Sequence, residues 1–284
     1  MHPIIRKLPE PVKDPISYGA WRVRSALSAD RRIDDVSAKR SLFAEKTGLE
    51  IGGPSKVLTR LLPIYHWAAR IDNCNFSDQT IWENMIDAGE TFQFNRRRAP
   101  GTQYILEATN LSGIPDEHYD FVVSCHALEH VANPILALKE WIRVMKSGGT
   151  LALILPHKEG TFDHRRPVTP LSHLIDDFEN RVSEDDQTHV EEILRLHDYS
   201  RDHGTPSEAE MRLRLAAMAE TRCVHHHVFD TPSAISLVDH VGLEIAHAQA
   251  CLPHEIVIIA RKSNGRFDNE CVEFKSPFGS DLAS

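Results

Sequence analysis

The stretch that decides the fold is Leu49-Glu50-Ile51-Gly52-Gly53-Pro54-Ser55. It runs from an apolar, strand-like segment through an acidic residue into a glycine turn, and a helical pattern begins directly after it. Glycine lets the backbone approach a ligand closely because it has no Cβ atom. A carboxylate such as that of Glu50 accepts hydrogen bonds from hydroxyls or an amine. The stretch therefore predicts a strand–turn–helix unit that receives a nucleoside-containing cofactor.

A second pattern of strand, helix and strand lies further along the chain. Phe121–Cys125 predicts a buried parallel strand, the helical pattern after it ends at Gly148, and Leu151–Leu155 predicts the next strand. The run YDFV…ALEHV…ALKEWIRVMKSGGTLALILP resembles the second half of the sheet in class I S-adenosylmethionine-dependent methyltransferases. The resemblance covers residues 45–160, with weaker support to residue 262. The IGGPS turn is similar to that of a subgroup of bacterial methyltransferases associated with surface-polysaccharide synthesis.

The resemblance implies an α/β fold, with a doubly wound, mostly parallel, seven-stranded Rossmann-like sheet, an antiparallel terminal hairpin and an inserted lid. We expect an N-terminal arm and helix over residues 1–46 and the methyltransferase domain over residues 47–262. Within that domain, residues 157–230 are expected to form a substrate-covering insertion, and residues 263–284 a loosely held tail. The seven predicted strands are Leu49–Ile51, Tyr65–Ile71, Gln103–Leu106, Phe121–Cys125, Leu151–Leu155, Leu243–Ala250 and Glu255–Ala260.

Composition narrows the class of protein. The chain has 284 residues, of which 41% are hydrophobic, and its net charge of −9 argues against a general nucleic-acid binder, which needs a basic face. The five cysteines are widely spaced and form no CxxC pair, so neither a zinc ribbon nor a disulfide framework is indicated. The sequence shows no apolar run typical of a signal peptide or a membrane span. We expect a cytoplasmic enzyme that acts on a small-molecule or glycan acceptor.

The resemblance implies S-adenosylmethionine as the cofactor and S-adenosylhomocysteine as the product. We expect Asp72 at the tip of the second strand to take both ribose hydroxyls, because parallel strands bring their carboxyl ends to one ligand-binding edge. Glu107 and Ala108 match the family residues that face the adenine. Pro54 departs from the family pattern, since it stands at the second glycine and has no N–H to offer. The expected cofactor-binding residues are Glu50, Gly52, Gly53, Pro54, Asp72, Glu107, Ala108, Ser124 and His126.

Methyl transfer from a sulfonium is an in-line displacement, and a hydroxyl acceptor also needs a base that removes its proton. Histidines and carboxylates that follow the fourth and fifth strands are therefore the catalytic candidates, and we expect Asp163 to orient a histidine and raise its basicity. These candidates are His126, His157, Asp163 and His164. The expected substrate-binding residues are Arg165, Arg166, His189, His225, His226 and His227, where the arginines would hold a carboxylate or phosphate.

Alternatives remain open at this point. Imidazole and carboxylate groups also bind zinc, manganese or iron, but the sequence has no HExxH or similar motif, so hydrogen-bonding histidines are the favoured interpretation. The altered glycine turn motivates a non-catalytic or regulatory cofactor-binding module. A nicotinamide-dependent oxidoreductase is disfavoured because the GxGxxG fingerprint is missing. The polar, histidine-rich insertion favours a sugar hydroxyl or another small polar acceptor.

Overall fold

The computed structural model describes residues 28–202, 204–205, 207–270 and 272–282. Residues 1–27 of the predicted N-terminal arm and helix at 1–46 lie outside the described residues. Residues 28–46 do not form one continuous helix as expected. They contain three short pieces, η1 (Ala29–Arg31), α2 (Val36–Lys39) and η2 (Arg40–Leu42), of which the last leads into buried Phe43.

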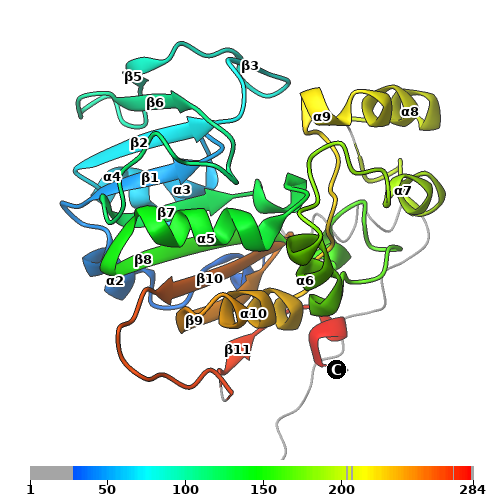
Figure 1. The fold of residues 1–284 in the computed structure, drawn as a ribbon. Coiled ribbons are helices and arrows are strands. Elements are labelled where there is room, and N and C mark those ends of the chain that lie inside the picture. The colour runs from blue at the N-terminus through cyan, green and yellow to red at the C-terminus, as the bar shows by residue number, and fades with distance from the viewer. Residues whose placement is uncertain (1–27, 203, 206, 271, 283–284) are drawn as a thin grey trace, which may run out of the picture.

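The centre of the molecule is a mixed sheet of nine strands in the order β11-β9-β10-β8-β7-β1-β2-β6-β5 (Figure 1). The five strands β8-β7-β1-β2-β6 are parallel, β10 is antiparallel to both β8 and β9, and β5 is antiparallel to β6. The strands are β1 (Thr47–Ile51), β2 (Arg70–Asn75), β5 (Gly89–Phe92), β6 (Gly101–Ile105), β7 (Tyr119–Cys125), β8 (Met145–Pro156), β9 (Glu244–Cys251), β10 (Glu255–Arg261) and β11 (Phe274–Lys275).

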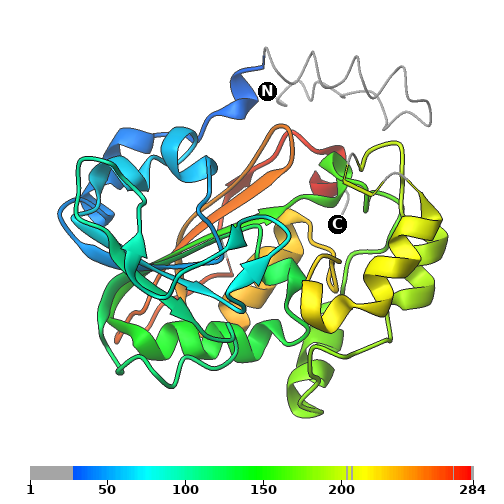
Figure 2. The same ribbon diagram turned by 90° about the horizontal axis from the view of Figure 1, so that it is seen from above.

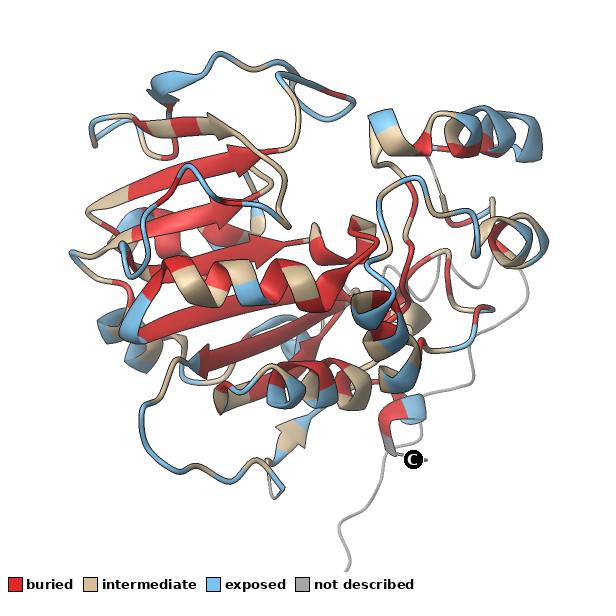
Figure 3. Ribbon diagram, viewed as in Figure 1, coloured by how far each residue is buried: buried red, intermediate tan, exposed pale blue. Residues whose placement is uncertain are grey.

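The central strands are buried, as Figure 3 shows by colour, and two clusters of apolar side chains pack against them. β8 is buried from Gly149 to Pro156 because both of its faces are covered, as is typical of strands in a parallel sheet. One core contains Trp141 of α5 (Pro134–Val144), which Asn133 caps at its N-terminus, together with residues of α10 (Thr231–His240). The other core contains Phe43, with residues of α3 (Val57–Arg60) and α4 (Ile64–Trp67).

The predicted Rossmann-like arrangement and its terminal hairpin are confirmed, but the count of seven strands is wrong. The two additional strands, β5 and β11, lie at opposite edges of the sheet. The expectation of a loosely held tail is also wrong for residues 274–282. β11 pairs with β9, and Asp281 of η5 (Gly279–Leu282) is buried and hydrogen-bonded to His157 and Thr231.

The second strand lies further along the chain than predicted. Tyr65 belongs to the single-turn helix α4, and the strand begins at Arg70 and continues to Asn75. Asp72 therefore occupies the middle of β2 rather than its carboxyl end. Its carboxylate accepts hydrogen bonds from Arg70, Tyr119 and the backbone N–H of Thr102, and it is 4% exposed.

Residues 157–230 pack beside the carboxyl ends of the parallel strands (Figures 1 and 2). They contain η4 (Lys158–Gly160), α6 (Leu171–Glu179), α7 (Val190–Leu196), α8 (Glu208–Ala216) and α9 (Met218–Thr221). Four buried side chains of α7, α8 and α9 and the following Val224 form a separate small core. A two-stranded hairpin, β3 (Gln79–Thr80) and β4 (Asn84–Met85), lies outside the main sheet. Within the described residues, no helix combines the length and hydropathy that a bilayer crossing requires.

Candidate active site

A cavity of about 660 Å³ opens at the carboxyl ends of β1, β2, β6 and β7. This edge is where ligands bind in open α/β sheets, since neighbouring parallel strands deliver their following loops to the same place. Hairpin β3–β4 and the insertion at 157–230 supply the remaining lining. The sheet-edge residues that matter most are Gly52, Gly53, Asn75, Glu107, Ala108 and His126. The facing residues are Trp82, Glu129, Phe162, Arg214, Arg222 and His225.

The turn after β1 requires a glycine at position 53. Both Gly52 and Gly53 have positive φ angles, of 79° and 88°, and a Cβ atom at Gly53 would lie 2.2 Å from Oε1 of Glu50. The Glu50 side chain lies beneath the turn and is fully buried, and the Tyr65 hydroxyl donates a hydrogen bond to Oε2 at 2.5 Å. Burial raises the pKa of Glu50 to about 8, against the opposing effect of that hydrogen bond. Glu50 therefore supports the turn without lining the cavity.

The ends of β2 and β6 bring polar and aromatic groups to one side of the cavity. Asn75 donates a hydrogen bond of 2.7 Å to Asn73, and Phe76 follows it directly. Glu107 lies after β6, and its Oε1 atom accepts a hydrogen bond of 2.9 Å from Arg222 of the insertion. The Arg222 guanidinium also lies 5.2 Å from the centre of the Phe76 ring. These contacts connect the insertion to the sheet edge where Glu107 was expected to bind a nucleoside.

His225 and Asp163 form a buried pair at the cavity. Nδ1 of His225 lies 2.5 Å from Oδ2 of Asp163, and Arg166 donates to Oδ1 of the same carboxylate at 3.0 Å. Burial opposes ionisation of Asp163, but the charges and hydrogen bonds of His225 and Arg166 outweigh it and hold the pKa of Asp163 below its usual value. His225 lines the cavity, and because Nδ1 is engaged by Asp163, Nε2 is the ring nitrogen left for a ligand. A histidine held in this way is arranged to accept a proton from a bound ligand.

Glu129 and His130, which the sequence analysis did not single out, also line the cavity next to His225. Both carboxylate oxygens of Glu129 are buried, and neither has a hydrogen-bond partner among the described residues. Burial raises the pKa of Glu129 to about 7. The His130 ring lies 4.7 Å from that of His225 and 5.4 Å from that of Trp82. His130 Nε2 lies 3.9 Å from Oε1 of Glu129, so the buried carboxylate could still accept a hydrogen bond from a polar ligand.

His126 and Ser124 differ in their access to the cavity. His126 lines it from the end of β7, with a positive φ angle of 53° and a buried Nε2 atom that has no hydrogen-bond partner within the described chain. Burial lowers the pKa of His126 to about 3, so its imidazole is neutral. Ser124 is fully buried within β7 and does not line the cavity. His126 is therefore placed to touch a ligand, while Ser124 is not.

The other predicted catalytic histidines are bound elsewhere. His157 is fully buried, its Nε2 lies 2.9 Å from Asp281, its Nδ1 accepts a hydrogen bond from the Glu159 N–H, and its ring stacks on Phe278. His164 lies 2.8 Å from Asp198. Neither histidine lines the cavity. The structure thus places both histidines in contacts away from this cavity, although both follow the fifth strand closely in the sequence.

The predicted substrate-binding residues separate in the same way, and only His225 lines the cavity. Arg166 is 1% exposed and binds Asp163, Glu192 and the carbonyls of His225 and His226, so its guanidinium is engaged within the insertion and does not reach a substrate anion. Arg165 pairs with Asp198 on the surface side of the insertion. His226 is buried, and its backbone N–H donates to the carbonyl of Glu129. His189 and His227 lie together in a separate cluster.

Several residues that line the cavity were not predicted from the sequence. Asn75 and Phe76 would have been found if the second strand had been placed five residues later, because Asn75 ends that strand and Phe76 directly follows it. Arg222 and Trp82 lie on an insertion helix end and on a hairpin, where periodicity gives no indication of what they face. Glu107, Ala108, Gly52, Gly53 and Pro54 lie in the cavity lining as placed from the sequence.

Comparison with known proteins gives a family match over part of the chain. Residues 52–153 match a family model described as a methyltransferase domain. No match was found among curated proteins. Among solved structures, the chain is similar to the Burkholderia thailandensis 1,6-didemethyltoxoflavin-N1-methyltransferase with bound 1,6-didemethyltoxoflavin and S-adenosylhomocysteine, with a TM-score of 0.47 and 12% identity over 93% of this chain and 99% of that chain.

Two further solved structures are similar. One is a methyltransferase from Methanosarcina mazei, with a TM-score of 0.45 and 18% identity over 82% of this chain and 99% of that chain. The other is a methyltransferase from Aquifex aeolicus, with a TM-score of 0.39 and 13% identity over 87% of this chain and 98% of that chain. The matched residues 52–153 run from the glycine turn through most of β8 and include most of the sheet edge that forms the cavity. The family match therefore places a methyltransferase domain over residues 52–153, the part of the chain that carries this sheet edge.

Proposed function

We propose that this enzyme transfers a methyl group to a hydroxyl of a sugar or another small polar acceptor, with His225 as the base. The observation that carries the proposal is the hydrogen bond between His225 and Asp163 at the cavity. A hydroxyl is a weak nucleophile at neutral pH, so its methylation is accelerated by a base within reach of its proton. Among the predicted histidines, His225 combines a carboxylate partner with a place in the cavity lining.

The residues present fit the proposed cofactor. A close backbone approach is possible at Gly52 and Gly53, where positive φ angles are adopted without a side chain. Asn75 and Glu107 offer amide and carboxylate groups to ribose hydroxyls and an adenine amine, and Phe76 and Ala108 offer apolar surfaces to the ring. The volume of about 660 Å³ lies within the usual range for a ligand pocket of roughly 300–1,000 Å³. When bound, S-adenosylmethionine supplies the electrophilic methyl group and leaves as S-adenosylhomocysteine.

The protein's own part in the reaction is positioning and proton transfer. The acceptor oxygen forms its new bond to the methyl carbon as the carbon–sulfur bond breaks, and Nε2 of His225 takes the hydroxyl proton. Asp163 keeps the proton of His225 on Nδ1, so that Nε2 presents a lone pair, and stabilises the imidazolium that forms. Asp163 acts through His225 and is therefore a positioning residue.

The lining favours a polar acceptor. Asp202, Arg214 and Glu129 bring charged groups to the part of the cavity beyond the sheet edge, and such groups match the hydroxyls of a sugar better than an apolar ring. The similarity of the IGGPS turn to polysaccharide-associated methyltransferases supports the same class. The net charge of −9 favours a small molecule or glycan over a nucleic acid as the partner.

The test begins with calorimetric titration of the purified protein with S-adenosylmethionine and S-adenosylhomocysteine, and we expect micromolar binding. Methyl transfer to a panel of sugars and nucleotide sugars is then followed by mass spectrometry. The variant His225→Asn keeps a donor for Asp163 but removes Nε2, so we expect unchanged binding of S-adenosylhomocysteine and loss of transfer. The matched control is His164→Asn, which removes a histidine bound to Asp198 away from the cavity. Absent binding of both nucleosides would refute the cofactor assignment, and full activity of His225→Asn would refute the base.

A further inference from the structure

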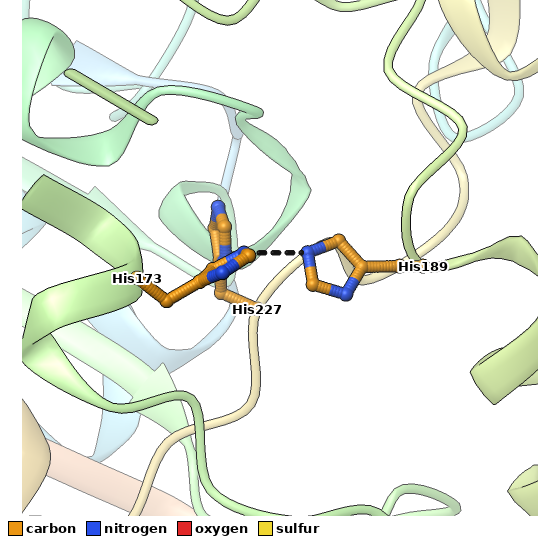
Figure 4. Close-up of side chains that lie close together, drawn as sticks. All are labelled: His173, His189 and His227. Atoms are coloured by element: carbon orange, nitrogen blue, oxygen red, sulfur yellow. Dashed lines mark hydrogen bonds between the residues drawn. The ribbon is translucent and has the colours of Figure 1, made fainter. Parts of the chain in front are cut away.

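Three histidines from separate parts of the insertion meet outside the cavity described above. His173 lies on α6, His189 directly precedes α7, and His227 lies in the segment that precedes α10. Figure 4 shows their imidazole rings close together. One ring nitrogen of each histidine lies within 4.8 Å of those of the other two, and the Nε2 atoms of His173 and His189 are 3.1 Å apart.

The spacing of the ring nitrogens is close to that of ligands on one metal ion. Zinc binds histidine nitrogen at about 2.0–2.1 Å, so two nitrogens on a tetrahedral ion lie roughly 3.3–3.4 Å from each other. The separation of 3.1 Å between His173 and His189 is near this value. A small movement of the half-buried rings of His173 and His189 would bring their Nε2 atoms to the separation expected on a zinc ion.

A carboxylate adjoins the same cluster. Asp177 lies one helical turn after His173 on α6, and its Oδ2 atom is 3.5 Å from Nε2 of His173 and 3.6 Å from Nε2 of His227. Nε2 of His227 also lies 3.2 Å from the Ala132 carbonyl oxygen, a hydrogen bond that an ion on this nitrogen would replace. This oxygen is buried and accepts no hydrogen bond from any residue that the structure describes. An unpartnered buried oxygen is costly. A cation held by the histidines would remove that cost.

From this geometry we propose that His173, His189, His227 and Asp177 bind a structural zinc ion. Three imidazole nitrogens and one carboxylate oxygen are ligands that zinc accepts, whereas magnesium and calcium prefer ligand sets made of oxygen. With four protein ligands the coordination is complete, as in structural zinc sites, so no position is left for a substrate.

The two other groups of possible metal ligands are weaker candidates. The group of Glu129, His130 and His225 offers two histidines and lines the cavity described above, so it belongs to the proposed active site. The group of His126, His254 and Glu255 has a single carboxylate and two histidines. Neither group brings together three histidines from three segments. Substitutions in these groups can show whether a bound metal lies there instead.

The zinc ion would join three segments that are distant in the sequence, since its ligands come from α6, the start of α7 and the segment around His227. That last segment also carries His225 two residues earlier. The ion would therefore hold the position of His225 through the backbone. This effect on catalysis rests on the proposed function, but the zinc site itself does not.

The test uses the full chain, purified without a polyhistidine tag from a culture supplied with zinc, and measures metal content by mass spectrometry. The double variant His173→Ala/His189→Ala removes two ligands. The matched control is His66→Ala, which removes an exposed histidine of α4, and His254→Ala reports on the competing group. Binding of S-adenosylhomocysteine is measured on the same samples, so that failure of the zinc site and failure of the proposed function give different results.

We expect about one zinc per chain in the unmodified protein, in His66→Ala and in His254→Ala, and at least about tenfold less in the double variant. X-ray absorption of the zinc-loaded unmodified protein should show nitrogen and oxygen ligands at about 2.0–2.1 Å with imidazole scattering. This measurement decides the question if the double variant does not fold. Absence of zinc from the unmodified protein, full retention in the double variant, loss in His254→Ala, or a sulfur-containing ligand shell would each overturn the proposal.

Discussion

The Nδ1 atom of His225 lies 2.5 Å from the Oδ2 atom of Asp163, although the two residues are 62 positions apart in the sequence. The contact determines which nitrogen of His225 carries a proton. A carboxylate only accepts hydrogen bonds, so it selects the tautomer with the proton on Nδ1 and leaves a lone pair on Nε2. The two residues therefore have to be tested as a unit.

Asp163→Asn should lower kcat by roughly 10²- to 10⁴-fold, the usual contribution of a general base. The asparagine carbonyl can still accept from Arg166, while its amide donates to Nδ1 of His225 and drives the imidazole proton to Nε2. The Kd for S-adenosylhomocysteine should stay unchanged because Asp163 does not line the cavity. Steady-state kinetics and calorimetry separate the two effects. Equal losses in cofactor binding and in kcat would mean that Asp163 only maintains the fold.

Gly53→Ala should weaken cofactor binding and destabilise the protein. The new Cβ atom would lie 2.2 Å from Glu50, and alanine also resists the positive φ angle of 88°. Gly242→Ala is a matched control, since Gly242 has a φ angle of 81° but open space around its Cβ position. We expect the control to cost about 1–2 kcal/mol of unfolding free energy and to leave cofactor binding unchanged. Gly53→Ala should lower the free energy of unfolding, measured by chemical denaturation, by more than Gly242→Ala does. An equal loss in the two variants would argue against the close contact between position 53 and Glu50.

Asp281→Ala should lower the free energy of unfolding by about 3 kcal/mol, although it lies three residues from the end of the chain. Its carboxylate accepts from Thr231 and lies 2.9 Å from Nε2 of His157, and all three residues are buried. Removing it leaves two buried polar groups without their partner. Urea denaturation measures the change, with exposed Ser280→Ala as the control. A loss below about 0.5 kcal/mol, the usual limit for surface substitutions, would contradict the buried arrangement.

Acid should destabilise the enzyme in part through His126. Burial lowers the pKa of His126 to about 3, while the unfolded chain keeps a value near 6.5. The neutral form is favoured in the folded state, so this stabilising contribution is complete above pH 6.5 and is lost as pH falls toward 3. The slope is at most about 1.4 kcal/mol per pH unit.

His126→Asn tests this pH dependence directly. Asparagine tolerates the positive φ angle of 53° at this position but does not titrate. Unfolding free energies measured by urea denaturation between pH 7 and 4.5 should therefore fall less steeply in the variant than in the unmodified protein. Parallel profiles would show that His126 is not the buried neutral group described above.

The central strands could be predicted because their residues are apolar on both faces. Leu151–Leu155 lies within β8, and Glu255–Ala260 matches β10 except for its last residue. The second strand was misplaced for the opposite reason. β2 reads Arg-Ile-Asp-Asn-Cys-Asn, and its buried asparagines are satisfied by hydrogen bonds, including one from Asn75 to Asn73. Hydropathy cannot reveal such a strand, so the apolar segment before it was chosen instead.

The candidate site was predictable only where the chain connects strand ends to the cavity. Gly53 and Glu107 each lie two residues beyond the end of a strand, so local sequence was sufficient to place them at the ligand-binding edge. The histidines of the insertion depend on contacts between distant residues. His157 lies 124 positions from Asp281, its partner, and sequence proximity to the fifth strand gave no indication of that ion pair.

The buried guanidinium of Arg166 restricts how a substrate can reach the cavity. It binds Asp163, Glu192 and the carbonyls of His225 and His226, so moving this side of the insertion would expose a charge and break several hydrogen bonds at once. Hairpin β3–β4 carries half-exposed Trp82 and lies outside the main sheet. Movement of the hairpin would break none of these bonds, so we expect the rate of product release to depend on the motion of that hairpin rather than on opening of the insertion.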